Sequence, residues 1–167
     1  MTVNASIPPR AAALVRDLVL TPHPEGGRYR ELFRSRRMVR TDDGRSERWA
    51  ATAILFLLCA GERRGLHRVA SDEVWTWHEG SPLELLLVDP AFDAVRAVVL
   101  GPAGDDVLPM RVVPAGIWQA ARPLGDYALA GCVVAPGFEL SDLRVLANDE
   151  LSASAFRARH PDLASWL

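Results

Sequence analysis

The sequence has little of what would mark several large classes of protein. It holds only two cysteines, Cys59 and Cys132, both inside apolar runs, which excludes a disulfide framework and predicts buried thiols. Its 19 basic and 21 acidic residues leave a formal net charge of -2, too small to attract nucleic acid or an anionic membrane surface. Neither a secretory apolar core near the N-terminus nor a run of about 18 apolar residues occurs, which predicts a soluble, cytoplasmic protein.

Charge is concentrated in one arginine-rich stretch between residues 28 and 48. Eight arginines fall there, and four interspersed acidic residues partly offset them. Two interpretations stay open. The stretch is either a solvated edge strand and loop that discourages aggregation between strands, or a source of one or two arginines, such as Arg28 and Arg30, that face a pocket and hold an anionic substrate.

Residues 1–167 are expected to form one domain, because a chain of this length can close a single core. Apolar residues spaced at i, i+3, i+4 and i+7 predict a helix over about residues 9–18. A second helix is expected over residues 149–159, with Asn148 or Asp149 at its N-cap. Between the helices, from about residue 28 to 146, short apolar runs are separated by turns that contain Gly or Pro. This rhythm predicts an all-β barrel or double-sheet jelly roll.

Three segments carry more specific expectations. Residues 50–60 are apolar on both faces, as expected of a strand buried between the barrel interior and a neighbouring helix or subunit. Residues 123–126, Pro-Leu-Gly-Asp, are expected to close the last hairpin. The segment Pro-His-Pro-Glu-Gly-Gly at residues 22–27 is either a functional loop or a tight corner that launches the first strand.

The candidate functional residues are centred on one motif. Four residues stand at the spacing G-x5-H-x5-E-x6-G: Gly61, His67, Glu73 and Gly80. This spacing resembles the first metal-binding motif of cupins, and a later Pro-Ala-Gly-Ile-Trp-Gln segment resembles the second. The resemblance implies a cupin double-stranded β-helix, the jelly-roll barrel of that superfamily. However, Val69 and Gln119 stand where metal-dependent cupins have two of their histidines.

The altered ligand set leaves several chemical interpretations open. His67, Glu73 and Gln119 could together hold a divalent metal weakly, because Val offers no lone pair and a Gln carbonyl is a poorer donor than an imidazole. A pocket without a cofactor is the main expectation, and in it His67 is suited to proton transfer near neutral pH, with Glu73 beside it. The structural alternative is a His–Glu pair that only stabilises the barrel.

Side-chain alternation extends the expected pocket. If Glu73 points into the barrel, Trp75 and Trp77 do so too, and Ser71 shares their parity. The two indoles then form either an aromatic wall suited to a planar ring or a sugar face, or plain core packing. On a facing strand Gln119 points to the same hollow. We therefore expect ligand contacts from four residues: Ser71, Trp75, Trp77 and Gln119.

A longer series of motifs resembles one particular family within the cupins. The segments P-H-P-E-G-G-x-Y-R-E, G-x5-H-R-x2-S-D-E-x-W, V-P-A-G-x-W-Q, G-D-Y-x-L-x-G-C and V-A-P-G-F-E closely resemble an uncharacterised family of small single-domain cupins, over about residues 18–146. By fold that family is grouped with the RmlC-like epimerases. The resemblance implies a homodimer and no established reaction. One departure is Thr76, where the family tends to have a His, whereas His78 is kept.

RmlC-like epimerases use a His base and a Tyr acid, so the resemblance implies a metal-independent isomerase or epimerase acting on a carbonyl-bearing, sugar-like substrate. His67 would be the base and Tyr127 or Tyr29 the acid, with Glu73 or Asp142 setting the imidazole tautomer. The alternatives are a noncatalytic module that binds a small ligand, and a weakly ligated metal enzyme. In each case the expected partner is a small molecule, not nucleic acid or a membrane.

Overall fold

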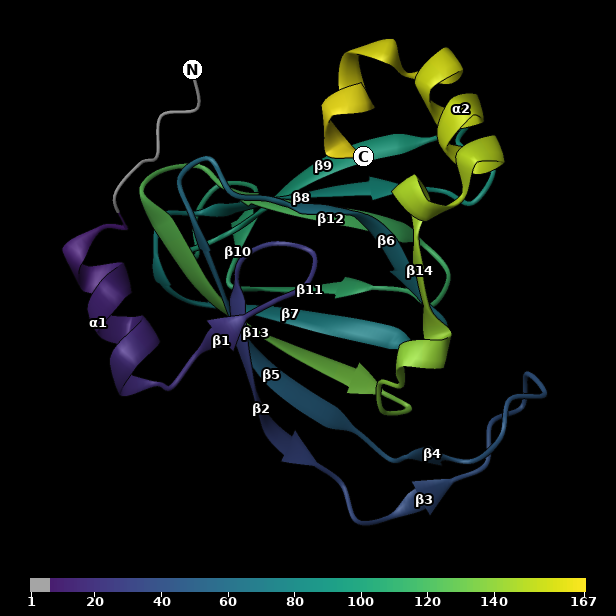
Figure 1. Cartoon of the computed structure of the whole chain (residues 1–167), viewed down its shortest axis with the longest axis horizontal. Coiled ribbons are helices and arrows are strands. Elements are labelled where there is room, and N and C mark those ends of the chain that lie inside the picture. The colour runs from purple at the N-terminus through teal and green to yellow at the C-terminus, as the bar shows by residue number, and fades with distance from the viewer. Residues whose placement is uncertain (1–6) are drawn as a thin grey trace.

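Two six-stranded β-sheets face each other in the computed structural model, which describes residues 7–167 (Figure 1). The strand order is β1-β2-β5-β13-β7-β11 in one sheet and β10-β9-β8-β12-β6-β14 in the other. Several strands that follow one another along the chain lie in different sheets, for example β5 and β6, or β12 and β13. This winding is a jelly-roll barrel and confirms the predicted fold class.

The strands are short and regular. The first sheet consists of β1 (Thr21–Pro22), β2 (Arg28–Arg34), β5 (Thr52–Cys59), β7 (Asp72–Gly80), β11 (Met110–Val113) and β13 (Tyr127–Ala135). The second consists of β6 (Arg64–Val69), β8 (Leu83–Val88), β9 (Val95–Leu100), β10 (Val107–Leu108), β12 (Trp118–Pro123) and β14 (Leu143–Val145). A separate pair, β3 (Met38–Val39) and β4 (Arg48–Trp49), extends beyond the barrel in Figure 1.

The helices lie on the outside. They are α1 (Pro9–Asp17), α2 (Glu150–Arg159) and the 3-10 turns η1 (Leu140–Asp142), η2 (Leu146–Asn148) and η3 (Pro161–Trp166). Both α-helices fall where the sequence predicts them, and Asp149 caps α2 by accepting from the backbone N–H of Ser152 at 3.3 Å. Residues 1–6 of the expected domain lie outside the described residues.

The apolar strand β5 shows why both of its faces are hydrophobic. Phe56 and Leu58 point into the barrel core between the sheets, whereas Leu57 and Cys59 pack outward against Leu14 of α1. The second covering element expected for this strand is therefore a helix of the same chain. At the other sheet, α2 and η3 bury the outer face of β6, β8 and β12 in the same way.

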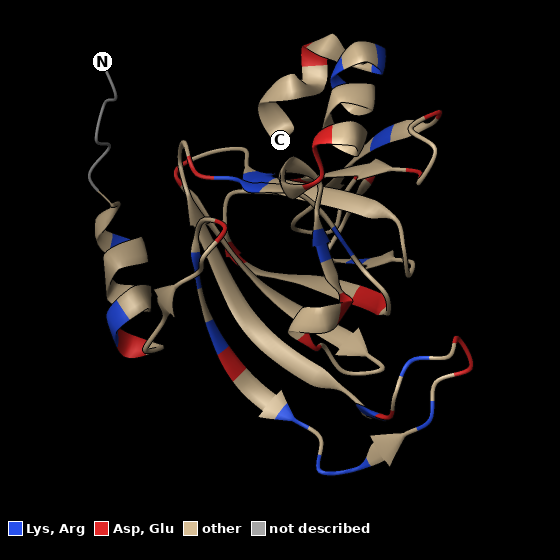
Figure 2. Ribbon diagram, turned by 45° about the vertical axis from the view of Figure 1, so that its right-hand side comes forward, with Lys and Arg blue, Asp and Glu red and all other residues tan. Residues whose placement is uncertain are grey.

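Two expectations about connections are resolved by the sheet topology. Residues 123–126 do not close a hairpin, because β12 pairs with β6 and β8 while β13 pairs with β5 and β7, so this turn crosses from one sheet to the other. The arginine-rich stretch runs from β2 through the β3–β4 arm, where basic residues line the outside of the molecule (Figure 2). Arg45 and Arg48 return from this arm to the barrel rim.

Candidate functional site

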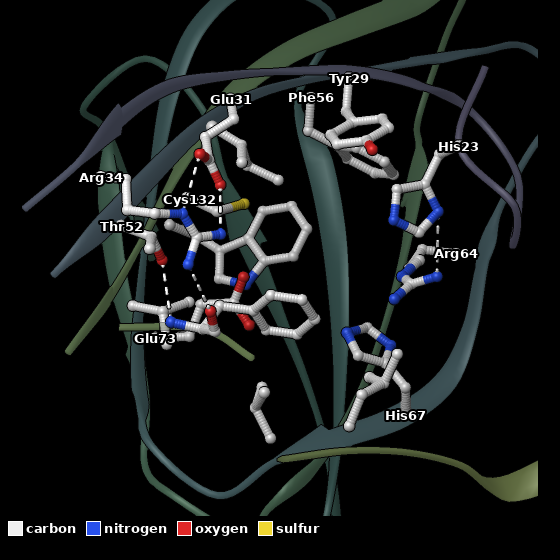
Figure 3. Close-up of a pocket in the computed structure, with 16 residues that line it drawn as sticks. His23, Tyr29, Glu31, Arg34, Thr52, Phe56, Arg64, His67, Glu73 and Cys132 are labelled. Carbon is white, nitrogen blue, oxygen red and sulfur yellow. Dashed lines mark hydrogen bonds and ion pairs between the residues drawn. The ribbon is translucent and has the colours of Figure 1, made fainter. Parts of the chain in front are cut away.

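A cavity of about 210 Å³ lies inside the barrel, walled by β2, β5, β6, β7 and β13 and by the loop at residues 22–27 (Figure 3). It is smaller than the roughly 300–1,000 Å³ of typical pockets for drug-sized ligands, so it suits a small metabolite. One wall is apolar and consists of Ile54, Phe56, Trp75, Val134, Phe138 and Leu143. The polar side chains form two groups in Figure 3: His23, Arg64 and His67 lie on one side, and Glu31, Arg34, Thr52 and Glu73 lie on the other.

A β-bulge brings two of these side chains to the same face of β6. His67 pairs with Gln119 of β12 and Arg64 pairs with Ala121, so the register shifts between them. In a regular strand, residues three apart point to opposite faces, and the extra residue of a bulge removes that offset. Arg64 and His67 therefore both line the cavity, while Leu66 packs on the outside.

His67 is buried, and its tautomer follows from a hydrogen bond to the backbone. Its Nδ1 lies 2.9 Å from the backbone carbonyl oxygen of Gly65. A carbonyl can only accept, so Nδ1 carries the proton and Nε2 keeps a lone pair. Burial, reinforced by the positive charge of Arg64, holds the pKa of His67 well below its usual value, so the ring is neutral at physiological pH.

His23 reaches the cavity from the loop at residues 22–27. Its Nδ1 accepts from the backbone N–H of Glu25 at 3.1 Å and lies 3.3 Å from Nη1 of Arg64. Because Nδ1 acts as the acceptor, the proton of the neutral ring is on Nε2. Burial, and then the charge of Arg64, lower the pKa of His23 to about 4. His23 thus offers an N–H donor, whereas His67 offers a lone pair.

The loop that carries His23 is also a tight corner. Gly27 has a φ of +75°, and a Cβ at this position would lie 2.7 Å from the carbonyl oxygen of Leu57. Only glycine satisfies both constraints. The two interpretations of this loop are therefore compatible, because the packing that makes the corner also sets the position of His23.

Arg64 lies between the two imidazoles, as Figure 3 shows. Its side chain is 8% exposed and forms an ion pair with Glu25 through Nη1. Burial lowers the pKa of Arg64 to about 10, so the guanidinium is still charged at neutral pH. Tyr29 of β2 adds a phenol to this end of the cavity, its ring edge-on to His23 with the centroids 4.9 Å apart.

Glu73 is held by a chain of buried hydrogen bonds. Nε2 of Gln119 donates to Oε2 of Glu73 at 2.5 Å, and the indole N–H of Trp75 donates to Oε1 of Gln119 at 2.9 Å. Burial raises the pKa of Glu73. Among residues 7–167 no hydrogen bond joins Glu73 to His67, and the Gly65 carbonyl fixes the imidazole tautomer where the sequence suggested Glu73 or Asp142.

The donor set does not fit a metal. Both amide atoms of Gln119 are bonded to protein groups, and the apolar Val69 lines the cavity two residues from His67. Within the described part of the chain, no three His, Cys, Asp or Glu side chains come together in a way that could ligate an ion. Gln119, suggested by the sequence as a weak ligand, instead connects Trp75 to Glu73.

Several expected site residues lie away from the cavity, among them Tyr127, Asp142 and Ser71. Tyr127 is on the outer side of the first sheet, where its hydroxyl donates to Glu79 at 2.8 Å. Asp142 accepts from Arg48 and Arg45 at 2.8 Å each, and Ser71 accepts from Arg45 at 3.1 Å. These bonds anchor the arginine-rich arm to the barrel rim.

Strand alternation explains the position of the other expected residues. Tyr29 of β2 points into the cavity, so Arg28 and Arg30 point away, where they bind Glu62 at 2.9 Å and the Leu18 carbonyl at 3.1 Å. Arg34, beyond a bulge in β2, is the arginine of this strand that lines the cavity.

On β7, Trp75 lines the cavity and Trp77 packs farther along the core, with its indole N–H donating to the Ser81 carbonyl at 3.1 Å. Thr76, the departure from the family pattern, lies between them on the opposite face. The exposed His78 is positioned over Gly131, whose added Cβ would lie 2.6 Å from the imidazole Nε2.

A jelly-roll barrel with a small cavity between its sheets is the architecture of cupins, which share it with other jelly-roll proteins. Residues 12–146 match the family model described as Cupin superfamily (DUF985), and the chain belongs to this family. The family resemblance seen in the sequence is thereby confirmed. A comparison with curated proteins finds no match.

Solved structures of similar proteins cover almost the whole chain. A hypothetical protein from Leishmania major is 28% identical, with a TM-score of 0.81 over 93% of this chain and 94% of that one. A protein from Shewanella oneidensis is 30% identical, with a TM-score of 0.81 over 94% of this chain and 96% of that one. Oxalate decarboxylase from Bacillus subtilis shares the fold alone. It is 16% identical, with a TM-score of 0.56 over 87% of this chain and 36% of the decarboxylase chain.

The expected homodimer and cytoplasmic location stay predictions. In residues 7–167, every helix is too short or too polar to cross a membrane.

Proposed function

We propose that this protein is a metal-independent cupin that binds a small carbonyl-bearing molecule and moves a proton on it, as an isomerase or epimerase does. The observation that carries the proposal is the state of His67. With Nδ1 bonded to the Gly65 carbonyl, the free lone pair is on Nε2 of a ring that lines the cavity. Because its pKa is held below the usual range, the imidazole is unprotonated at neutral pH and its Nε2 lone pair is free.

The groups around His67 suit the charge that proton removal would create. When Nε2 takes a proton from the carbon beside a carbonyl, the electron pair moves toward the carbonyl oxygen as an enolate. Donors placed where that negative charge develops lower the barrier. His23 offers Nε2–H, Arg64 offers a guanidinium and Tyr29 a phenol at the same end of the cavity. An enolate beside the imidazolium also raises the pKa of His67 in the same step.

Tyr29 is the candidate acid. Of the two tyrosines that the sequence suggests for this role, it is the one that lines the cavity, while Tyr127 is bonded to Glu79 outside. A proton returned by the phenol to the opposite face of the enolate carbon inverts that centre, and a proton returned to a neighbouring carbon gives an isomer. The apolar wall around Phe56 and Trp75 would hold the rest of the substrate.

Deuterium exchange tests this function without knowledge of the natural substrate. The protein is incubated in D₂O with a panel of small monosaccharides and 2-oxo acids, and loss of the proton next to each carbonyl is followed by NMR. We expect catalysed exchange with at least one compound, and a loss of about 100-fold or more in His67→Gln and Tyr29→Phe. Tyr127→Phe, the matched control, should keep the rate. Exchange that survives His67→Gln would overturn the assignment.

A noncatalytic binding module is the second candidate, and the apolar wall of the cavity favours it. A cavity that combines apolar side chains with polar groups is typical of a binding site as well as of an active site. Mass spectrometry of small molecules released from the denatured protein identifies a bound ligand in either case. A ligand that binds with no exchange in any compound of its class would favour this candidate.

A further inference from the structure

Arg64 carries the positive charge on the side of the cavity where His23 and His67 lie. The bulge in β6 turns its side chain inward, and the guanidinium lies between His23 and His67 (Figure 3). Its charge also acts on Glu73 across the cavity. The altered cupin motif lacks two of the metal-binding histidines, and Arg64 contributes a fixed cation to the same cavity.

Part of this guanidinium has no partner. Nη1 is used by Glu25 and by Nδ1 of His23, whereas among residues 7–167 neither Nε nor Nη2 of Arg64 makes a hydrogen bond. The side chain is 8% exposed and lines the cavity. This edge of the guanidinium lines the cavity without a protein partner, so it is suited to an acceptor that enters the cavity.

Arg34, at the rim of the same cavity, lacks this property. It is 33% exposed, and two carboxylates already neutralise it, Glu31 at 2.7 Å and Glu139 at 3.1 Å. A ligand anion would have to displace one of them. At Arg64 it would meet open N–H groups, with Glu25 left in place on Nη1.

We propose that Arg64 anchors the ligand and that the ligand is a small carboxylate bearing a carbonyl, such as a 2-oxo acid. The Nε and Nη2 edge of a guanidinium binds the two oxygens of a carboxylate side by side. A carboxylate held there leaves the adjoining carbonyl and its α-carbon next to the imidazole of His67. This inference rests on the proposed function in one respect: the anion held by Arg64 is the substrate on which His67 acts.

Equilibrium binding of pyruvate tests the anchor, because pyruvamide is a neutral analogue of nearly the same shape. By titration calorimetry we expect the unaltered protein to bind pyruvate more tightly than pyruvamide. Arg64→Met should weaken pyruvate binding by about 10- to 100-fold and leave pyruvamide almost unchanged. Arg122→Met is the matched control, since Arg122 lies on β12 of the same sheet and pairs with Glu84 outside the cavity.

Arg64→Met leaves the Glu25 carboxylate without its ion-pair partner and can impair folding. Two further measurements therefore test the anchor without relying on this variant. Arg64→Lys keeps the charge but loses the bidentate edge, and we expect an intermediate affinity. In the unaltered protein, the Nε–H NMR signal of Arg64 should shift with pyruvate and not with pyruvamide. Equal affinity for the two compounds, no pyruvate binding at tens of millimolar, or folded Arg64 variants that bind pyruvate normally would each overturn the anchor.

Different results would contradict the carboxylate anchor at Arg64 and the proton transfer by His67. Pyruvate binding that depends on Arg64, with no deuterium exchange in any 2-oxo acid, supports the anchor and removes the proton transfer. Exchange that depends on His67 in neutral sugars, with no binding of pyruvate, keeps the proton transfer and removes the carboxylate.

Discussion

The hydrogen-bond chain through Gln119 predicts a measurable energetic coupling. Gln119→Leu keeps a side chain of similar size but removes the acceptor for the indole N–H of Trp75 and the donor to Glu73. A buried donor left unpaired costs about 1–3 kcal/mol, and a lost hydrogen bond about 1 kcal/mol more. We therefore expect the free energy of unfolding to fall by about 2–4 kcal/mol, a large share of the roughly 5–15 kcal/mol of a typical domain.

A double-mutant cycle isolates the part due to Trp75. Trp75→Phe removes the N–H that needs an acceptor, so Gln119→Leu should cost about 1–3 kcal/mol less in that background than in the unaltered protein. Urea unfolding of the four proteins, with similar m values, measures the difference. A coupling energy below about 0.5 kcal/mol would refute the reasoning. If Gln119 instead served a ligand, its replacement would weaken binding and leave stability nearly unchanged.

Two further predictions concern the loop that carries His23. Because burial lowers the pKa of His23 to about 4, the unfolded chain binds more protons than the folded one between about pH 4 and 6.5, and stability should fall as pH drops through this window. In urea titrations at several pH values, His23→Gln should lose less stability over this window. The raised pKa of Glu73 has the opposite effect on stability, but it is present in both proteins and does not change the difference between them. Gly27→Ala combines a positive φ with a steric clash and should lower thermal stability more than Gly44→Ala, whose φ is +82° with open space around the Cβ.

A specific result would contradict each of these two predictions. Parallel pH profiles for His23→Gln and the unaltered protein would mean that the imidazole is not desolvated in the folded state. Equal losses at the two glycines would mean that Leu57 moves freely away from the added Cβ.

Much of the fold could be predicted from the sequence because a buried strand is visible there as a short run of apolar residues. The apolar run at residues 50–60 and the strand-length runs after it correspond to β5 and its successors. The crossing at residues 123–126 could not be predicted in the same way. Pro, Gly and Asp indicate a change of direction, but the signal is the same whether the chain returns beside its own sheet or passes to the opposite one.

The site was predictable where alternation is regular and not where it is interrupted. Alternation along β7 brings Glu73 and Trp75 to the cavity as predicted from their spacing. Arg64 escapes this reasoning because a bulge separates it from His67. His23 depends on the fold of a loop, for which the glycines at residues 26 and 27 are the available signal. Pairings with distant residues, such as Tyr127 with Glu79, leave no trace in spacing.

A cation that is part of the polypeptide differs from one captured from solution. Arg64 is present once in every folded molecule, cannot exchange with a competing ion, and has a charge that persists well above neutral pH. Bound transition metals compete with one another for the same donors and depend on supply. The positive charge that Arg64 contributes to this barrel is therefore fixed at translation.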